Sequence, residues 1–104
     1  MAFKVPESKA HLKRNRFEFE LGGEVLSLPK LDYTPASGDE YLATAASRSL
    51  PFAGYVLGFM EACDPEVGAK VRAAKLNRDQ LEALHTAWKG SSKVDEGESS
   101  NSSE

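Results

Sequence analysis

Residues 16–28 read RFEFELGGEVLSL, and apolar and polar side chains alternate on both sides of Gly22-Gly23. Two adjacent glycines between alternating segments are typical of a two-residue hairpin turn. In that register the facing pairs are Phe17 with Leu28, Phe19 with Leu26 and Leu21 with Glu24. The two phenylalanines and the leucines opposite them then share one face, and Pro29 ends the second strand. The sequence therefore predicts a β-hairpin whose apolar face is covered by helices or by another chain.

Downstream of the hairpin, capping residues and apolar periodicity predict about four short helices. Ser37 and Glu40 form the capping box of a short helix that ends by Ser49. Pro51 suits the first position of the next helix, whose broad apolar stripe makes it the centre of the core. The stripe consists of Phe52, Tyr55, Val56, Phe59, Met60 and Cys63.

The same helix carries a second row of small residues, Gly54, Gly58 and Ala62, at every fourth position. Such a row lets a neighbouring backbone approach closely. Two interpretations stay open for it: tight packing within the monomer, or a face for self-association. A domain this small has a modest core, so assembly into a homo-oligomer would add to its stability.

Each of the last two helices begins with a recognisable cap. Asp64 caps a helix whose first residue is Pro65. Asn77 caps the final helix with Gln80 at the reciprocal position, and Gly90 is expected to stop it. The residues expected to face the core from these two helices are Val67, Val71, Leu81, Leu84 and Trp88.

Charge and composition divide the chain into a flexible basic arm over residues 1–15, a folded body over 16–89 and a tail over 90–104. The net charge is +4 for residues 1–16, −4 for 17–89 and −3 for 90–104. The tail, GSSKVDEGESSNSSE, has too little apolar surface to offset the entropy of ordering it, so we expect it to be disordered. The acidic body and tail argue against nucleic acid as the main partner.

The sequence predicts neither a membrane partner nor a catalytic site. No apolar run approaches the ~20 residues that cross a bilayer, and no secretory signal is evident, so we expect a cytosolic protein. Cys63 lies on an apolar stripe, where a thiol behaves as a small hydrophobe. His11 and His85 supply no paired set of metal ligands, and no two catalytic side chains share an identifiable site. We therefore expect no enzymatic activity, metal or cofactor.

A helix-turn-helix is an alternative interpretation of residues 65–89. In that case Asn77 and Arg78 stand at the start of a recognition helix. Asp79 and Glu82 on its exposed face would repel phosphates, so a small DNA-binding regulator remains the second interpretation.

Two segments together resemble one protein family: the hairpin RFEFELGGEVLSLPKL and the closing stretch LNRDQLEALHTAWKGSSKVDEGESSNSSE. A strand pair, a helical body and a Ser/Glu-rich end after a Trp-bearing helix are similar to the tail assembly chaperones of long-tailed, siphovirus-type phages. The chain resembles the short upstream product of a frameshifted pair, down to its Gly97-Glu98-Ser99-Ser100 ending. The middle, residues 41–75, matches no motif of the family.

The resemblance implies a non-catalytic protein that coats the tape measure protein, keeps it soluble and yields it as tail tube protein polymerises around it. It implies action in the host cytoplasm, absence from the mature virion, and a longer frameshifted version of the chain as a further partner. A minor structural protein of the particle is the other alternative. A holdase needs apolar surface for its client. We expect that surface to include four partly exposed residues, Phe17, Phe19, Tyr55 and Trp88.

Overall fold

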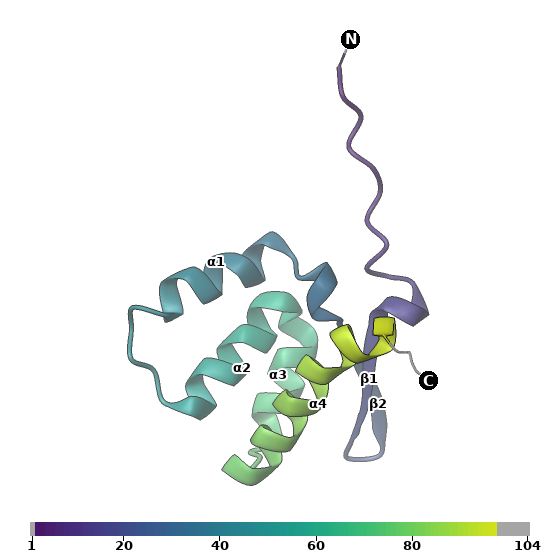
Figure 1. The fold of residues 1–104 in the computed structure, drawn as a ribbon. Helices are drawn as coiled ribbons and strands as arrows, with labels where there is room; N and C mark the ends of the chain where they lie inside the picture. The colour runs from purple at the N-terminus through teal and green to yellow at the C-terminus, as the bar shows by residue number, and fades with distance from the viewer. Residues whose placement is uncertain (1, 98–104) are drawn as a thin grey trace.

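The computed structural model describes the backbone of residues 2–97 and the side chains of residues 2–91. Within that range the fold is mainly helical, with an N-terminal hairpin followed by four helices, as the sequence predicts (Figure 1). The elements are the short 3-10 turn η1 (Lys13–Asn15), strands β1 (Arg16–Leu21) and β2 (Glu24–Pro29), the 3-10 turn η2 (Leu31–Tyr33), and helices α1 (Ala36–Ala45), α2 (Phe52–Cys63), α3 (Pro65–Ala73) and α4 (Arg78–Gly97).

The hairpin has the predicted turn and register. Gly22 and Gly23 take φ of 59° and 82°, a left-handed conformation that glycine adopts without a steric penalty. β1 and β2 are antiparallel, and the facing pairs are Phe17 with Leu28, Phe19 with Leu26 and Leu21 with Glu24. The apolar face of the pair therefore turns toward the helices, where Leu26 and Leu28 are buried.

The core is built around α2, which packs against α1, α3, α4 and β2. Its buried residues are Leu28, Val56, Phe59, Met60, Val71, Leu81 and Trp88. Three of them come from the predicted stripe of α2, while Tyr55 and Cys63 at the margins of that stripe are half-buried. The helix that the periodicity identified as the centre of the core does occupy that place.

The predicted capping box of the first helix is wrong. Pro35 precedes α1, and its carbonyl accepts from the backbone N–H groups of Gly38 and Asp39. Ser37 therefore lies inside the first turn, and its hydroxyl donates instead to the carbonyl of Ala62 at 2.6 Å. A tertiary hydrogen bond between α1 and the end of α2 has replaced the local one.

The other helix starts agree with the sequence or differ by one residue. Pro51 is the residue before α2 rather than its first. Asp64 caps α3 as predicted, since Oδ1 accepts from the backbone N–H of Glu66 and of Val67 at 3.2 Å each, and Pro65 is the first helical residue. At the start of α4, the backbone N–H of Asn77 donates to Oε1 of Gln80 at 2.8 Å, the predicted reciprocal bond.

Helix α4 does not stop at Gly90, contrary to prediction, and continues to Gly97. A glycine disfavours a helix by only about 1 kcal/mol and ends it when φ becomes positive. Positive φ occurs at Gly22 and Gly23 but not at Gly90. The predicted boundary after residue 89 thus falls within a helix, and the part of the predicted tail over 98–104 lies outside the described residues.

The row of small residues on α2 is used inside the monomer. The Tyr41 hydroxyl of α1 donates to the carbonyls of Gly54 and Tyr55 at 3.2 and 3.0 Å. A Cβ at Gly58 would collide with the same phenol, and Ala62 receives the bond from Ser37. Of the two interpretations, tight internal packing accounts for this row.

Candidate protein-binding surface

The four predicted binding residues lie in three different environments. Phe17 and Phe19 are half-buried on β1, and their rings stack with centroids 5.7 Å apart. Tyr55 is half-buried on α2, where its ring neighbours are Tyr41 at 6.2 Å and His85 at 6.2 Å. Trp88 is in the core. The structure thus brings the two phenylalanines together, while Tyr55 has its ring neighbours on α1 and α4.

The predicted partial exposure of Trp88 is wrong, because its exposed fraction is 0%. The indole stacks on Phe59 with centroids 5.0 Å apart, and its Nε1–H donates to the carbonyl of Pro29 at 2.9 Å. An indole needs both apolar contact and an acceptor for its N–H; Phe59 of α2 provides the contact, and Pro29 at the end of β2 provides the acceptor. Trp88 therefore joins the hairpin to α4 and is not available to a client.

The apolar face of the hairpin is covered unequally. β2 packs against α2 and α3, and its Leu28 is fully buried, whereas Phe17, Phe19 and Leu21 on β1 pack against the core and remain partly exposed. In the part of the chain that the structure describes, β1 pairs only with β2 in a two-stranded sheet. Alternate residues of β1 consequently point their N–H and C=O groups away from β2. We call this side of the strand the β1 edge, and the three partly exposed residues with it the β1 surface.

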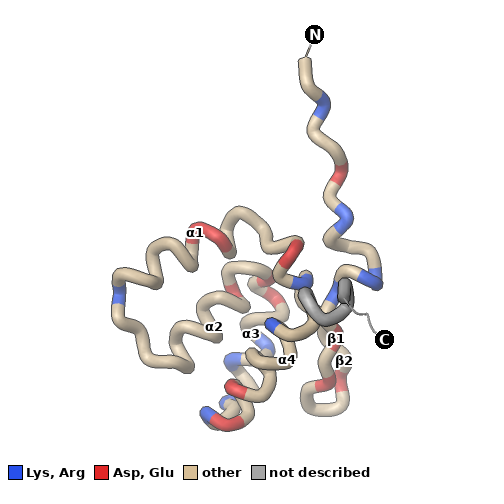
Figure 2. The backbone as a smooth tube through the Cα atoms, viewed as in Figure 1, with Lys and Arg blue, Asp and Glu red and all other residues tan. Residues whose placement is uncertain are grey.

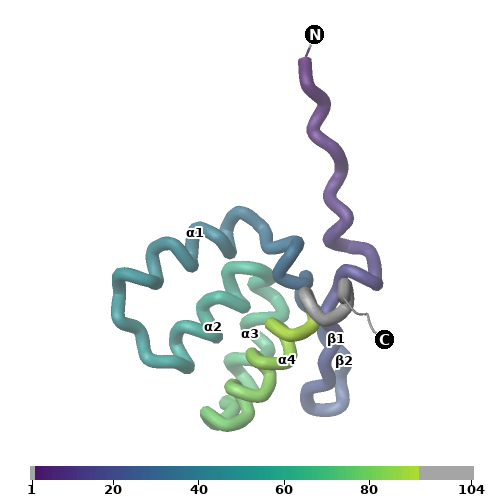
Figure 3. Tube along the Cα trace, viewed as in Figure 1, coloured from purple at the N-terminus to yellow at the C-terminus, as the bar shows by residue number. Residues whose placement is uncertain are grey.

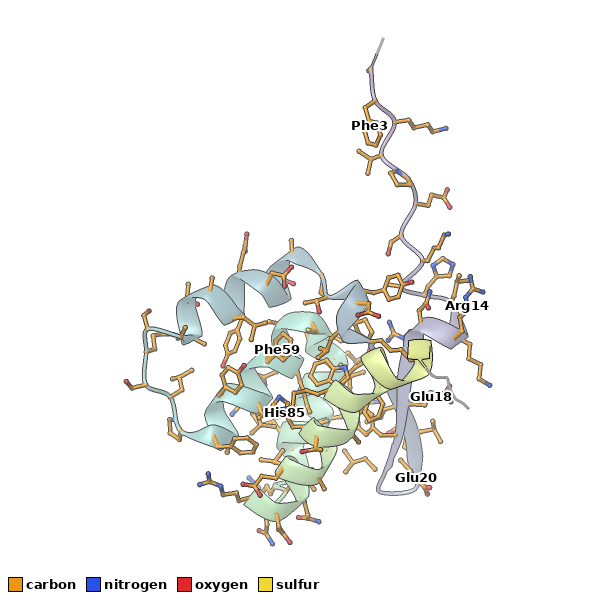
Figure 4. All side chains as sticks on the ribbon, viewed as in Figure 1. Phe3, Arg14, Glu18, Glu20, Phe59 and His85 are labelled. Carbon is orange, nitrogen blue, oxygen red and sulfur yellow. The ribbon has the colours of Figure 1, made fainter. Side chains whose placement is uncertain are left out.

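The opposite face of the hairpin is acidic. Glu18 and Glu20 are exposed there, on the same face as Val25, which is 65% exposed. Figure 2 shows the acidic residues along the hairpin, and Figure 4 labels the two glutamates. Glu24 at the turn is used by the fold, because its Oε2 accepts from Lys70 Nζ at 2.7 Å. The β1 edge thus separates an apolar strip from a negatively charged one.

A second aromatic cluster joins α2 and α4. His85 packs edge-on against Phe52 and Tyr55, with centroid distances of 5.8 and 6.2 Å, and the Arg78 guanidinium lies over Phe52 at 5.3 Å. Burial lowers the pKa of His85, and the positive charge of Lys89 lowers it further. The cluster is half-buried, and its imidazole is held in the neutral form by its surroundings.

Protonation of His85 is expected to destabilise the fold as the pH falls. The unfolded chain binds a proton near the ordinary pKa of about 6.5, above the pKa of the folded state, so stability is lost as pH drops through this range. We expect the free energy of unfolding, measured by urea denaturation at about pH 8 and about pH 5, to fall more for wild type than for His85→Gln. His11→Gln, at an exposed position in the arm, is the matched control. An equal pH dependence in wild type and His85→Gln would contradict this role.

One cavity of about 460 Å³ lies where the arm, the hairpin and the α2–α3 junction meet. Its charged groups already serve the fold: Arg16 donates to Oγ and the carbonyl of Ser27, and Asp64 caps α3. Burial, followed by the charges of Asp39 and Asp64, raises the pKa of the Cys63 thiol to about 12. A thiol that stays protonated is a poor nucleophile, which fits the interpretation of Cys63 as a packing residue.

Neither a metal site nor a membrane-spanning helix is found in the described part of the chain. No group of three His, Cys, Asp or Glu residues there could hold a metal ion. Among the helices of residues 2–97, none combines the length and apolar character that a bilayer crossing requires.

The helix-turn-helix interpretation gains no support from the placement of Arg78. Its guanidinium lies over Phe52, and its Nε donates to Glu82 Oε2 at 3.2 Å. The cation at the start of the supposed recognition helix is therefore engaged by its own domain.

Sequence reasoning missed the most exposed large apolar side chains among residues 2–91, which are Phe3 and Val5 in the arm. They are 85% and 77% exposed. The alternation of Phe3, Lys4 and Val5 is a short strand pattern within the basic arm, and it could have indicated this segment.

Comparison with known proteins found no matching family model, no similar curated protein and no similar solved structure.

Proposed function

We propose that this chain is a tail assembly chaperone of a long-tailed phage, which binds the tape measure protein and keeps it soluble until tail tube protein polymerises around it. The resemblance of the hairpin and of the Trp-bearing C-terminal region to that family supports the proposal. The structural observation that carries it is the β1 surface. There a stacked Phe17–Phe19 pair lies partly exposed beside an open strand edge.

The β1 surface has the properties that reversible client binding requires. Buried apolar area contributes roughly 25 cal/mol per Å², so two partly exposed aromatic rings give a modest gain in binding free energy per contact. Many copies along a long client would hold it firmly, while each copy could be displaced singly. The exposed Glu18 and Glu20 on the other face add charge that keeps the complex in solution.

The proposal includes the setting that the resemblance implies. The chain acts in the host cytoplasm and is absent from the mature virion, and a longer frameshifted version of it shares the same body. Because the β1 surface lies in residues 16–21, both versions would present it to the client.

Co-expression with the tape measure protein of the same genome tests the proposal. We expect the soluble fraction of the client to be high with wild type and to fall to the level without chaperone with Phe17→Ser/Phe19→Ser. The double variant removes the apolar contact at the β1 surface. Val25→Ser, on the other face of the hairpin, is the matched control and should retain wild-type activity.

A photo-reactive ring at position 19 provides a test that preserves an aromatic side chain. With p-benzoylphenylalanine in place of Phe19, irradiation should crosslink the chain to the tape measure protein. A client that is equally soluble without the chain, or recovery of the chain from purified virions by mass spectrometry, would overturn the proposal.

A further inference from the structure

We propose that residues 2–5 of one copy pair with the β1 edge of a second copy and form a third strand of its sheet. We call residues 2–5 the arm tip. The inference concerns the association of the chain with itself in the absence of its client. Because the arm tip would cover the β1 surface that the client would bind, the two compete for it.

The arm is fixed at its base and free at its tip. The backbone N–H of Leu12 and Nδ2 of Asn15 both donate to the carbonyl of Lys9, at 3.1 and 2.9 Å, so the chain is held against the body from Lys9 onward. Before that point it leaves the body, and Figures 1 and 3 show it running away from the helices and from the hairpin. Phe3, labelled on it in Figure 4, and Val5 lie in solvent with exposed fractions of 85% and 77%.

The side chains of the arm tip match both faces of the hairpin. In an extended strand Phe3 and Val5 point to one side and Lys4 to the other. Placed along the β1 edge, the two apolar side chains would lie beside the Phe17–Phe19 pair. Lys4 would then lie on the acidic face. Apolar and opposite-charge neighbours of this kind stabilise a pair of strands.

The proline that follows sets the length of the added strand. Pro6 has no backbone N–H and interrupts a ladder of hydrogen bonds. The arm tip is therefore a strand of four residues, about the part of the six-residue β1 that carries Phe17 to Glu20. An extended peptide that adds to an open sheet edge gains backbone hydrogen bonds as well as side-chain contacts.

Charge and direction favour a second copy as the occupant. The arm up to Arg16 is basic, with a net charge of +4, and the exposed residues of β1 are glutamates. The arm extends from the end of the molecule opposite to the hairpin turn (Figures 1 and 2), which suits a neighbour better than its own sheet. Two copies that exchange arms form a closed pair in which both β1 edges are covered.

Sedimentation velocity over a concentration series tests the contact with the full chain. Wild type should self-associate, and Phe3→Ser/Val5→Ser should raise the dissociation constant about tenfold or more, because two apolar side chains lose their burial. Val25→Ser, at another exposed valine, should associate like wild type. A wild type that remains monomeric at about 0.5 mM, or an arm variant that associates equally well, would overturn the proposal.

Charge reversal tests the pairing of Lys4 with the acidic face. Lys4→Glu should weaken association, and combining it with Glu18→Lys/Glu20→Lys should restore it. The reversed pair recreates the attraction with opposite signs. If Lys4→Glu weakened self-association equally in wild type and in Glu18→Lys/Glu20→Lys, the pairing would be contradicted.

Disulfide formation between two chains that carry cysteine at different positions shows which copy supplies the added strand. A chain with Lys4→Cys, mixed with a chain with Glu18→Cys and mildly oxidised, should give the mixed disulfide dimer. Glu40→Cys, at an exposed site on α1, is the control partner and should not. Cys63 can stay in both chains, because burial raises the pKa of its half-buried thiol. In one chain with both cysteines, a purely intramolecular disulfide would show that the arm folds back on its own sheet and would overturn the proposal.

Discussion

Trp88→Ala is expected to remove about 3–5 kcal/mol of the free energy of unfolding, the range for deleting a fully buried tryptophan. The free energy of unfolding of a small domain is roughly 5–15 kcal/mol, so the variant loses a large part of its stability or fails to fold. Two contacts are lost at once: the ring that stacks on Phe59 and the Nε1–H that satisfies the carbonyl of Pro29. Urea denaturation followed by far-ultraviolet circular dichroism measures the change without relying on tryptophan fluorescence.

Trp88→Phe separates the two contributions. It keeps an aromatic ring beside Phe59 but leaves the Pro29 carbonyl without its donor, which should cost about 1–3 kcal/mol. Tyr55→Ala, at a half-buried ring, should cost less than Trp88→Ala. If the free energy of unfolding of Trp88→Ala were within about 1 kcal/mol of the wild-type value, the indole could not be the buried link between α4 and the hairpin.

Local signals predicted the parts of the fold that local chemistry determines. The turn at Gly22-Gly23 and the register that follows from it depend on two neighbouring residues and a period of two. The cap at Asp64 likewise involves groups two and three residues apart. In these places no distant contact displaces the local one: Arg16 lies 4.0 Å from Oδ2 of Asp64, and Oδ1 still caps the helix.

Two helix boundaries differ from the predictions, each for its own reason. The Ser37 hydroxyl could cap its own helix, but the carbonyl of Ala62 at the end of α2 binds it instead. Glycine frequently ends a helix, yet α4 continues through Gly90 in a helical conformation. The first outcome depends on a contact 25 residues away in the sequence, which periodicity does not contain. The second is not decided by the residue type, because glycine can either continue a helix or end it.

Exposure within an apolar stripe was the least predictable feature of the candidate site. Phe17 and Trp88 are both aromatic residues on apolar faces, and nothing local distinguishes them. Phe17 lies on β1, while Trp88 meets β2, the strand that packs against α2 and α3, through Pro29. The order of the elements around the core decides which ring stays accessible, and it follows from tertiary packing.

Gly68→Ala is expected to destabilise the fold by about 1–3 kcal/mol, the range for overpacking a close contact. A Cβ at this position would lie 2.5 Å from Cα and 2.6 Å from the backbone nitrogen of Glu61, where α3 crosses α2. Backbone atoms cannot rotate out of the way. Arg72 also holds the Glu61 carboxylate, with its Nε 2.6 Å from Oε2 and its Nη2 2.9 Å from Oε1. The two helices must therefore separate, which opens the core at Val71.

Gly90→Ala is the matched control, because the same substitution in α4 meets no atom within 4 Å. Alanine favours a helix over glycine by about 1 kcal/mol, so this variant should be slightly more stable than wild type. The same preference acts at Gly68, and the difference between the two variants in urea denaturation isolates the helix contact. A Gly68→Ala protein as stable as Gly90→Ala would mean that α2 and α3 are not in backbone contact. If alanine lowers the free energy of unfolding at position 68 and raises it at position 90, the close approach of α2 requires glycine at position 68. No contact requires glycine at position 90.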